Sequence, residues 1–233
     1  MPDIEEILKK GDTEFRVLQH ILKRTGSLLL IGVLMVNTNR LDAEVAGIDR
    51  NLWALLMYVG VILSWRVTGR ESTERGRLFG RVIHWSGIVL LLFVMVIFRT
   101  SEGGWLTPQW WGILGIIGWS YLVSALAYLF LKRHLKHHML LFIGLLVYHG
   151  VYASFPWLRE EAGWLAINSF GAHPSLTYAG MVATLVMYRY KDQSSKLFLI
   201  WGGAGVIFLV AGFGLRPLWG ISKIGATPSW VHL

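Results

Sequence analysis

The sequence has no cysteine among its 233 residues, and only 15% of its residues are charged. The missing cysteines exclude disulfides, zinc sites built on thiolates and a cysteine nucleophile. An average soluble domain has about 25% charged and about 45–50% apolar residues, whereas this chain is 54% hydrophobic. Such a composition also excludes disordered, collagen-like and coiled-coil chains. Because the polar surface is too small to cover a water-soluble globule, the composition predicts a membrane protein.

Seven apolar stretches are predicted to cross the membrane as helices. They are residues 26–38, 52–66, 82–98, 110–131, 138–155, 175–189 and 196–214. A helix needs about 20 residues to cross a hydrocarbon core of about 30 Å, so the shorter stretches need flanking residues to complete a crossing. The predicted fold class is therefore all-α, a polytopic integral membrane helical bundle of about seven transmembrane helices in a single domain, 1–233.

The two ends of the chain differ from the apolar middle, residues 26–214. Residues 1–25 interleave apolar and basic residues at helical spacing, which predicts a basic amphipathic lead-in at the cytoplasmic surface. They show no signal-peptide pattern. Residues 215–233 are expected to form an outer loop that leads into the start of a truncated eighth helix.

The distribution of basic residues predicts the orientation of the chain. Sixteen of the 22 Lys and Arg residues lie in the segments on the same side as the N-terminus, and six lie on the other side. Because cytoplasmic loops carry the excess of Lys and Arg, the N-terminus is predicted to be inside. The net charge of +8 then reflects topology rather than nucleic-acid binding, and the expected partner is the lipid bilayer. The sequence leaves a homo-oligomer open.

Two histidines are candidate catalytic residues. His149 lies inside the fifth apolar stretch, where an ionisable group is a functional candidate by default, although a neutral histidine bonded to a neighbouring helix is the alternative. His173 opens the sixth stretch on the predicted outer side. The unpaired N–H groups of a helix start favour an anion or oxyanion, so His173 is predicted to act as a general base or an orienting hydrogen-bond partner. A plain helix entry is the competing interpretation.

The remaining polar positions include candidate substrate-binding residues and a pair of histidines with the spacing of metal ligands. Candidate substrate-binding residues on the predicted outer side are Asn37, Arg50, Asn168 and Lys223, with a helix-capping role as the alternative for Asn37. His134 and His138 have the i, i+4 spacing of two metal ligands. Neighbouring cations would oppose a dication there, so a basic cytoplasmic cap is favoured and no metal site is predicted.

Several motifs resemble a known family. The motifs are Lys10–Thr13, His20–Arg24, Gly32–Asn37, Asn51–Leu56 and Gly220–Trp230, of which Ile221–Lys223 and Thr227–Trp230 are the most specific. Together they resemble the later part of bacterial membrane proteins related to heparan-alpha-glucosaminide N-acetyltransferase.

The resemblance implies an acyltransferase of the bacterial inner membrane. Such an enzyme takes an acyl group, expected to be acetyl from acetyl-CoA, on the cytoplasmic side and transfers it to an amino or hydroxyl group of a sugar on the far side. Arg77 and Arg81 in a basic inner segment would suit the phosphates of CoA. The competing explanation for these arginines is the positive-inside rule itself.

The chain departs from the family in one important respect. An Arg-x-Asp-x-x-Arg-Gly stretch and the outer loop with the family's catalytic histidine are both missing from this sequence. Enzymatic activity is therefore expected only if the native protein contains that N-terminal segment, and His173 and His149 remain hypotheses drawn from their own positions. The alternative is a non-catalytic multi-span membrane protein, either an inactive partner or a transporter. A transporter would require paired charges at the midplane, and no apolar stretch holds an acidic residue well inside it.

Overall fold

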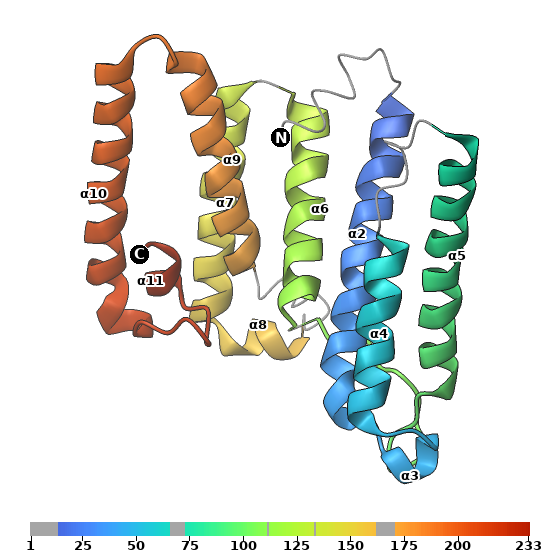
Figure 1. Ribbon diagram of the computed structural model, residues 1–233. Helices are drawn as coiled ribbons and strands as arrows, with labels where there is room; N and C mark the ends of the chain where they lie inside the picture. The colour runs from blue at the N-terminus through green and yellow to red at the C-terminus, as the bar shows by residue number, and fades with distance from the viewer. Residues whose placement is uncertain (1–13, 66–72, 111, 133, 162–170) are drawn as a thin grey trace. The chain divides into compact units, whose positions relative to one another are not determined.

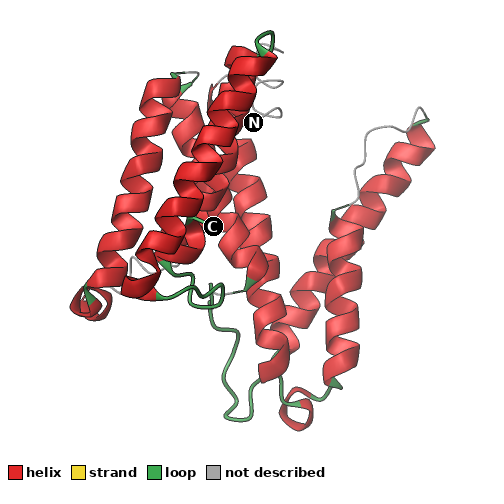
Figure 2. Cartoon of the chain, turned by 90° about the vertical axis from the view of Figure 1, so that its left-hand side faces the viewer, coloured by secondary structure: helices red, strands yellow, loops and turns green. Residues whose placement is uncertain are grey.

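The computed structural model describes residues 14–65, 73–110, 112–132, 134–161 and 171–233. All regular elements in these ranges are helices, which confirms the all-α class (Figure 2). Four helical segments are long and apolar enough to cross a membrane: Glu14–Arg40, Glu74–Ile97, Ile113–Leu131 and Ser194–Trp219. Apolar helices of this length are characteristic of a membrane protein.

Each of the seven predicted stretches coincides with a helix (Figure 1). In chain order the elements are α2 (Glu14–Asn37), η1 (Thr38–Arg40), α3 (Ala43–Ala46), α4 (Arg50–Ser64), α5 (Glu74–Ile97), α6 (Ile113–Leu131), α7 (Leu135–Ser154), α8 (Pro156–Glu161), α9 (Ala172–Tyr190), α10 (Ser194–Trp219) and α11 (Pro228–Val231). α7 and α9 are as long as α6 but more polar, and α4 is only about 22 Å long at 1.5 Å per residue.

The helices near both ends of the chain extend beyond the apolar stretches. From Glu14 onward, the lead-in and the first apolar stretch form one continuous helix, α2, and the earlier residues of the lead-in lie outside the described ranges. α10 continues five residues beyond the predicted limit of 214 and passes through Pro217. It ends where Gly220 adopts a positive φ of 65°, a conformation that costs glycine little.

The chain divides into two compact units, residues 29–115 and residues 1–28 with 116–233. In the first unit, Asp42 and Asp49 cap the starts of α3 and α4. Each aspartate accepts hydrogen bonds from two backbone N–H groups of the helix that follows. Such caps replace the partners that the first turn of a helix lacks.

The core of the unit 29–115 is built around Trp53. The indole N–H of Trp53 donates to the carbonyl of Val94 over 2.8 Å, and its ring lies edge-on to Phe98 with centroids 5.6 Å apart. The buried residues of this core come from the end of α2, from α4 and from α5, and they are Leu34, Leu41, Trp53, Met57, Leu91, Val94 and Phe98. The hydrogen bond of the indole therefore joins α4 to α5 within an otherwise apolar contact.

Glycines bring α4 and α5 into close contact. A Cβ atom added to Gly87 would lie 2.8 Å from the carbonyl oxygen of Gly60 and 2.8 Å from Cβ of Leu63. No side chain fits at such distances, so only glycine allows the two backbones to approach this closely. Small residues play the same role wherever membrane helices cross.

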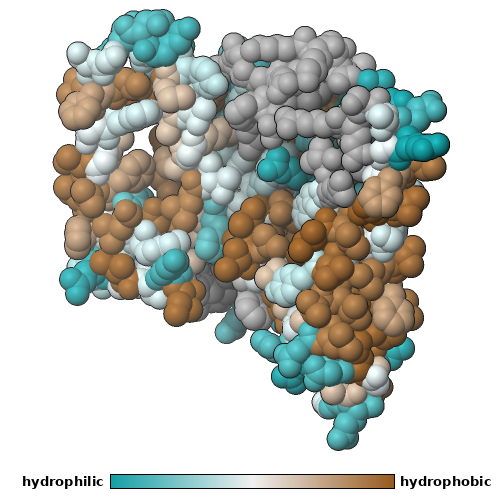
Figure 3. Space-filling view, viewed as in Figure 1, coloured by the Kyte–Doolittle hydropathy of each residue, from teal (hydrophilic) through white to brown (hydrophobic). Residues whose placement is uncertain are grey.

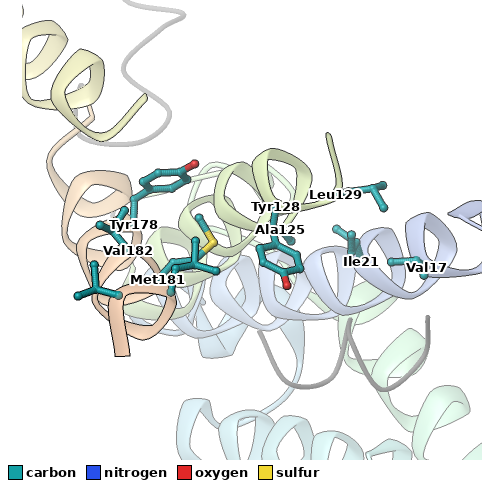
Figure 4. Packing of buried hydrophobic residues seen from close by; sticks show 10 residues of the cluster. Val17, Ile21, Ala125, Tyr128, Leu129, Tyr178, Met181 and Val182 are labelled. Atoms are coloured by element: carbon teal, nitrogen blue, oxygen red, sulfur yellow. The ribbon is translucent and has the colours of Figure 1, made fainter. Parts of the chain in front are cut away.

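The other unit has its own core, formed by the first half of α2 together with α6 and α9. Figure 4 shows Val17 and Ile21 of α2 on one side, Ala125, Tyr128 and Leu129 of α6 in the middle, and Tyr178, Met181 and Val182 of α9 on the other. α7 packs against α9, and α10 packs against both α9 and α11. α11 also contacts α7 and α9, so the C-terminal segment lies beside these two helices.

We predict that Gly87→Ala destabilises the protein. The added methyl group forces α4 and α5 apart, and overpacking of this kind costs about 1–3 kcal/mol. Gly205→Ala in α10 is the matched control, because nothing lies within 4 Å of a Cβ at Gly205 and alanine favours a helix by about 1 kcal/mol over glycine. Thermal unfolding in detergent should show a lower Tm for the Gly87 variant only. Equal Tm values for Gly87→Ala and the parent protein would contradict the close crossing.

Candidate functional site

The start of α9 and the last residues of the chain form one cluster with α7. The cluster consists of buried Ala172, Ala226 and Val231, with Leu146 and Trp230 packed against them; we refer to it as the C-terminal cluster. Three separate segments of the chain meet here, and both predicted catalytic histidines belong to these segments.

His173 lies at the first turn of α9, at the edge of the C-terminal cluster. Its ring is edge-on to Trp230, with centroids 6.2 Å apart, and its side chain is half-buried. Among the described residues, neither ring nitrogen of His173 has a hydrogen-bond partner. An indole therefore shields one side of the ring, and no described residue occupies its two nitrogens.

Gly171 sets the entry into α9. Its φ is 92°, and a Cβ at this position would lie 2.7 Å from Cδ1 of Tyr148. The hydroxyl of Ser175 donates to the carbonyl of Gly171 over 2.7 Å. The same turn is thus fixed by a backbone conformation, by contact with α7 and by a hydrogen bond within α9, and it holds His173 at the helix start.

His149 lies on α7 and is buried, with 4% of its surface exposed. It follows Leu146 by three residues, so both side chains lie on the same face of the helix. Tyr152, three residues further along, is also buried, and its ring lies 4.8 Å from that of Tyr148. The structure therefore places His149 and His173 on two helices that pack against each other.

The Gly220–Trp230 motif forms a hydrogen-bonded turn that leads to Trp230. The hydroxyl of Thr227 donates to the carbonyl of Gly220 over 3.0 Å and accepts from the backbone N–H of Ser222 over 3.0 Å. The hydroxyl of Ser222 accepts from the N–H of Gly225 over 2.9 Å. The motif thus has a local structural function, which is to return the chain from α10 to the C-terminal cluster.

Two residues of this motif have polar groups without a partner among the described residues. Lys223 lies exposed in the turn and makes no ion pair there. The hydroxyl of Ser229 is buried and has no hydrogen-bond partner. Lys223 was predicted to bind substrate, and its exposure leaves the ammonium group accessible to an anionic or polar ligand.

Asn37 and Arg50, two other predicted substrate-binding residues, hold loops of the unit 29–115. The amide of Asn37 donates to the carbonyls of Val33 and Thr107, each over 2.8 Å, and its oxygen accepts from the N–H of Thr107 over 3.3 Å. Arg50 donates to the carbonyl of Leu41 over 3.2 Å. Asn37 therefore joins the end of α2 to the segment before α6. Asn168, the fourth candidate, lies outside the described residues.

Arg77 and Arg81, the predicted CoA-binding residues, lie one turn apart on α5 and are exposed. The i, i+4 spacing puts both guanidinium groups on the same side of the helix. Among the described residues no group of three or more His, Asp or Glu side chains could hold a metal ion.

A buried His138–Tyr178 pair is the polar feature that the sequence analysis missed. Nδ1 of His138 lies 2.6 Å from the hydroxyl of Tyr178, and Nε2 lies 2.8 Å from the carbonyl of Lys132. Because a carbonyl only accepts, Nε2 carries the proton, and the hydroxyl of Tyr178 donates to Nδ1. His138 also stacks on Tyr128, with centroids 5.9 Å apart.

The pair also explains the turn between α6 and α7. Lys132 has a positive φ of 51°, so the chain leaves α6 in the left-handed region. The ring Nε2–H of His138 donates to the carbonyl of Lys132 in this turn. In sequence, His138 reads as one of three cytoplasmic histidines among cations, and its partner lies 40 residues away on α9. No local pattern could have shown that one of the three is buried.

We predict that Tyr178→Phe lowers stability by about 1–2 kcal/mol, because Nδ1 of His138 is left buried without its donor. Tyr188→Phe is the matched control on the same helix, since the side chain of Tyr188 is 54% exposed and its loss should change stability by less than about 0.5 kcal/mol. Chemical unfolding of both variants in detergent measures the difference. If the two variants are equally stable, the hydrogen bond contributes nothing and the assignment of donor and acceptor is wrong.

Comparison with family models, with curated proteins and with solved structures finds no match. The resemblance of the Gly220–Trp230 and Gly32–Asn37 motifs to a known acyltransferase family therefore stays a prediction.

Proposed function

We propose that this chain is part of a membrane acyltransferase that transfers acetyl from acetyl-CoA to an amino or hydroxyl group of a sugar on the opposite side of the membrane. One observation carries the proposal. His173 lies half-buried at the start of α9 beside Trp230, and its two ring nitrogens have no partner among the described residues. A neutral imidazole in such a position can accept a proton from a bound nucleophile.

We further propose a bacterial inner-membrane protein that crosses the bilayer seven times with its N-terminus inside. The coincidence of all seven apolar stretches with helices supports this count, and the distribution of Lys and Arg supports the orientation. α4, α7 and α9 complete the seven in this scheme, each packed against a neighbouring helix. Packing of this kind lets a shorter or more polar helix lie within a bundle.

In the proposed reaction, the acceptor's amino or hydroxyl group attacks the carbonyl carbon of the thioester. Nε2 or Nδ1 of His173 takes the proton from the acceptor as the new C–N or C–O bond forms. The C–S bond then breaks, and CoA leaves as the thiolate. Trp230 presents the kind of flat aromatic surface on which a sugar ring packs, and the exposed ammonium of Lys223 can donate hydrogen bonds to sugar hydroxyls.

The remaining predicted residues support binding in this proposal. His149, buried on the helix beside α9, would orient polar groups near His173. Arg77 on α5 would bind a phosphate group of CoA, because a guanidinium group pairs with phosphate in a bidentate manner.

We predict that His173→Gln lowers the rate of acetyl transfer by about 10²–10⁴-fold, the usual contribution of a general base. His149→Gln should lower it as well. His137→Gln is the control, because His137 is exposed at the start of α7, far along that helix from His149. The assay follows labelled acetyl from acetyl-CoA to glucosamine in proteoliposomes containing the full chain.

Two outcomes would contradict the proposal. Wild-type turnover in both the His173 and the His149 variants would remove the proposed base. Failure of the folded protein to bind acetyl-CoA at all would remove the reaction and would favour a non-catalytic membrane partner.

A further inference from the structure

The surface of α5 carries a groove that the acyltransferase proposal does not use. It is lined by Leu63 at the end of α4 and, on α5, by Leu78, Arg81, Val82, Trp85, Ser86, Val89, Leu90 and Phe93. Its volume of about 1060 Å³ exceeds the usual range of about 300–1,000 Å³ for small-molecule pockets. The lining is apolar except near Arg81 and Ser86. Figure 3 shows that apolar side chains dominate the visible surface over α4 and α5.

The part of the groove before Gly87 follows from the unequal lengths of the two helices. α4 ends at Ser64, next to Gly87 at the close crossing, whereas α5 begins at Glu74. The final carbonyl of α4 accepts from Nδ1 of His84 over 2.6 Å, which fixes the end of α4 against α5. Thirteen residues of α5 precede Gly87, about 20 Å of helix that extends beyond the last turn of α4.

The groove is long enough for the acyl chain of a lipid in one leaflet. It follows α5 from Leu78 to Phe93, and the part from Arg81 to Phe93 covers about 18 Å at 1.5 Å per residue. Half of a hydrocarbon core of about 30 Å is about 15 Å. Arg81 comes immediately before the apolar part of α5, and the indole of Trp85 lies one turn further in. Arginine and tryptophan in this order are typical of the headgroup region.

The positive charge of Arg81, near one end of the groove, favours a lipid with an anionic headgroup. Within the described parts of the chain, the guanidinium of Arg81 has no hydrogen bond and no ion pair. An exposed cation at membrane depth attracts anionic lipid headgroups, and a guanidinium binds a phosphate through two N–H groups. The apolar lining of the same groove accommodates a long hydrocarbon chain, which acetyl-CoA does not have.

We propose that this groove binds one anionic phospholipid, with its phosphate on Arg81 and an acyl chain along Val82, Val89 and Phe93. The lipid comes from the leaflet on the side of Arg81, which is the cytoplasmic leaflet in the proposed orientation. The site is independent of the acetyl-transfer reaction. Both phosphate ligands, lipid and CoA, share the chemistry of a guanidinium–phosphate pair, but only the lipid fills the groove.

The test measures lipid binding to the full chain in detergent by native mass spectrometry. The probes are dioleoyl phosphatidylglycerol and, as the zwitterionic comparison, dioleoyl phosphatidylcholine. We expect one phosphatidylglycerol to bind more tightly than phosphatidylcholine, and Arg81→Gln to weaken its binding about tenfold. Arg75→Gln removes the same charge from an exposed position on α5 outside the groove and should leave binding unchanged.

A second pair of variants tests the acyl-chain part of the groove. Val89 and Val96 are exposed to nearly the same extent, 63% and 64%, but only Val89 lines the groove. Val89→Trp should fill the groove and weaken phosphatidylglycerol binding, whereas Val96→Trp should not. Equal effects of the two tryptophans, or of Arg75→Gln and Arg81→Gln, would show a general surface effect and overturn the site.

Two further outcomes separate the lipid from other occupants. Displacement of the bound phosphatidylglycerol by excess CoA would assign Arg81 to CoA and overturn the proposal. A dimer whose formation is blocked by Val89→Trp would assign the groove to a second copy of the chain. His173→Gln should bind the lipid normally, so a loss of acetyl transfer and a loss of lipid binding remain distinguishable.

Discussion

The structure depends on one constraint, which is that backbone N–H and C=O groups in apolar surroundings must find partners within the protein. Helices satisfy these groups along their length, so the difficult positions are helix ends and turns. In this chain several such positions receive a specific polar group. Asp42 and Asp49 cap helix starts, His84 donates to the last carbonyl of α4, and His138 donates to the carbonyl of Lys132.

The same constraint separates the role of two histidines, His84 and His138, from that of His173. His138 and His84 use ring nitrogens to complete turns, and their hydrogen bonds are part of the fold. His173 lies at the start of α9, and its ring makes no hydrogen bond to the backbone of the described residues. Its imidazole therefore has no role in completing a turn there, unlike the rings of His84 and His138.

Close helix contacts are the second determinant of the architecture. Gly60 and Gly87 allow α4 and α5 to approach, and Gly32 allows α2 to approach the segment at Gly115, where a Cβ on Gly32 would lie 2.6 Å from the backbone nitrogen. A crossing fixed at one point leaves the longer helix uncovered beyond it. In α5 this uncovered length forms one part of the groove, from Leu78 to Ser86, and the groove continues past the crossing to Phe93. Packing at the glycines and an accessible apolar surface thus have a common cause.

The all-α class and the positions of the helices follow from the amino-acid sequence alone. Low charge, long apolar stretches and turn residues act locally, and all seven stretches coincide with helices. Of the predicted site residues, Asn168 alone lies outside the described residues. The apolar stretch was expected to end at 214, whereas α10 continues to Trp219 and stops before Gly220. Which polar residues serve the fold depends on the tertiary contacts. Asn37 forms a hydrogen bond with Thr107, 70 residues away in the sequence, and His138 forms one with Tyr178, 40 residues away. Such pairings depend on which helix faces pack together, and the periodicity of one helix marks its buried face but not the partner that covers it.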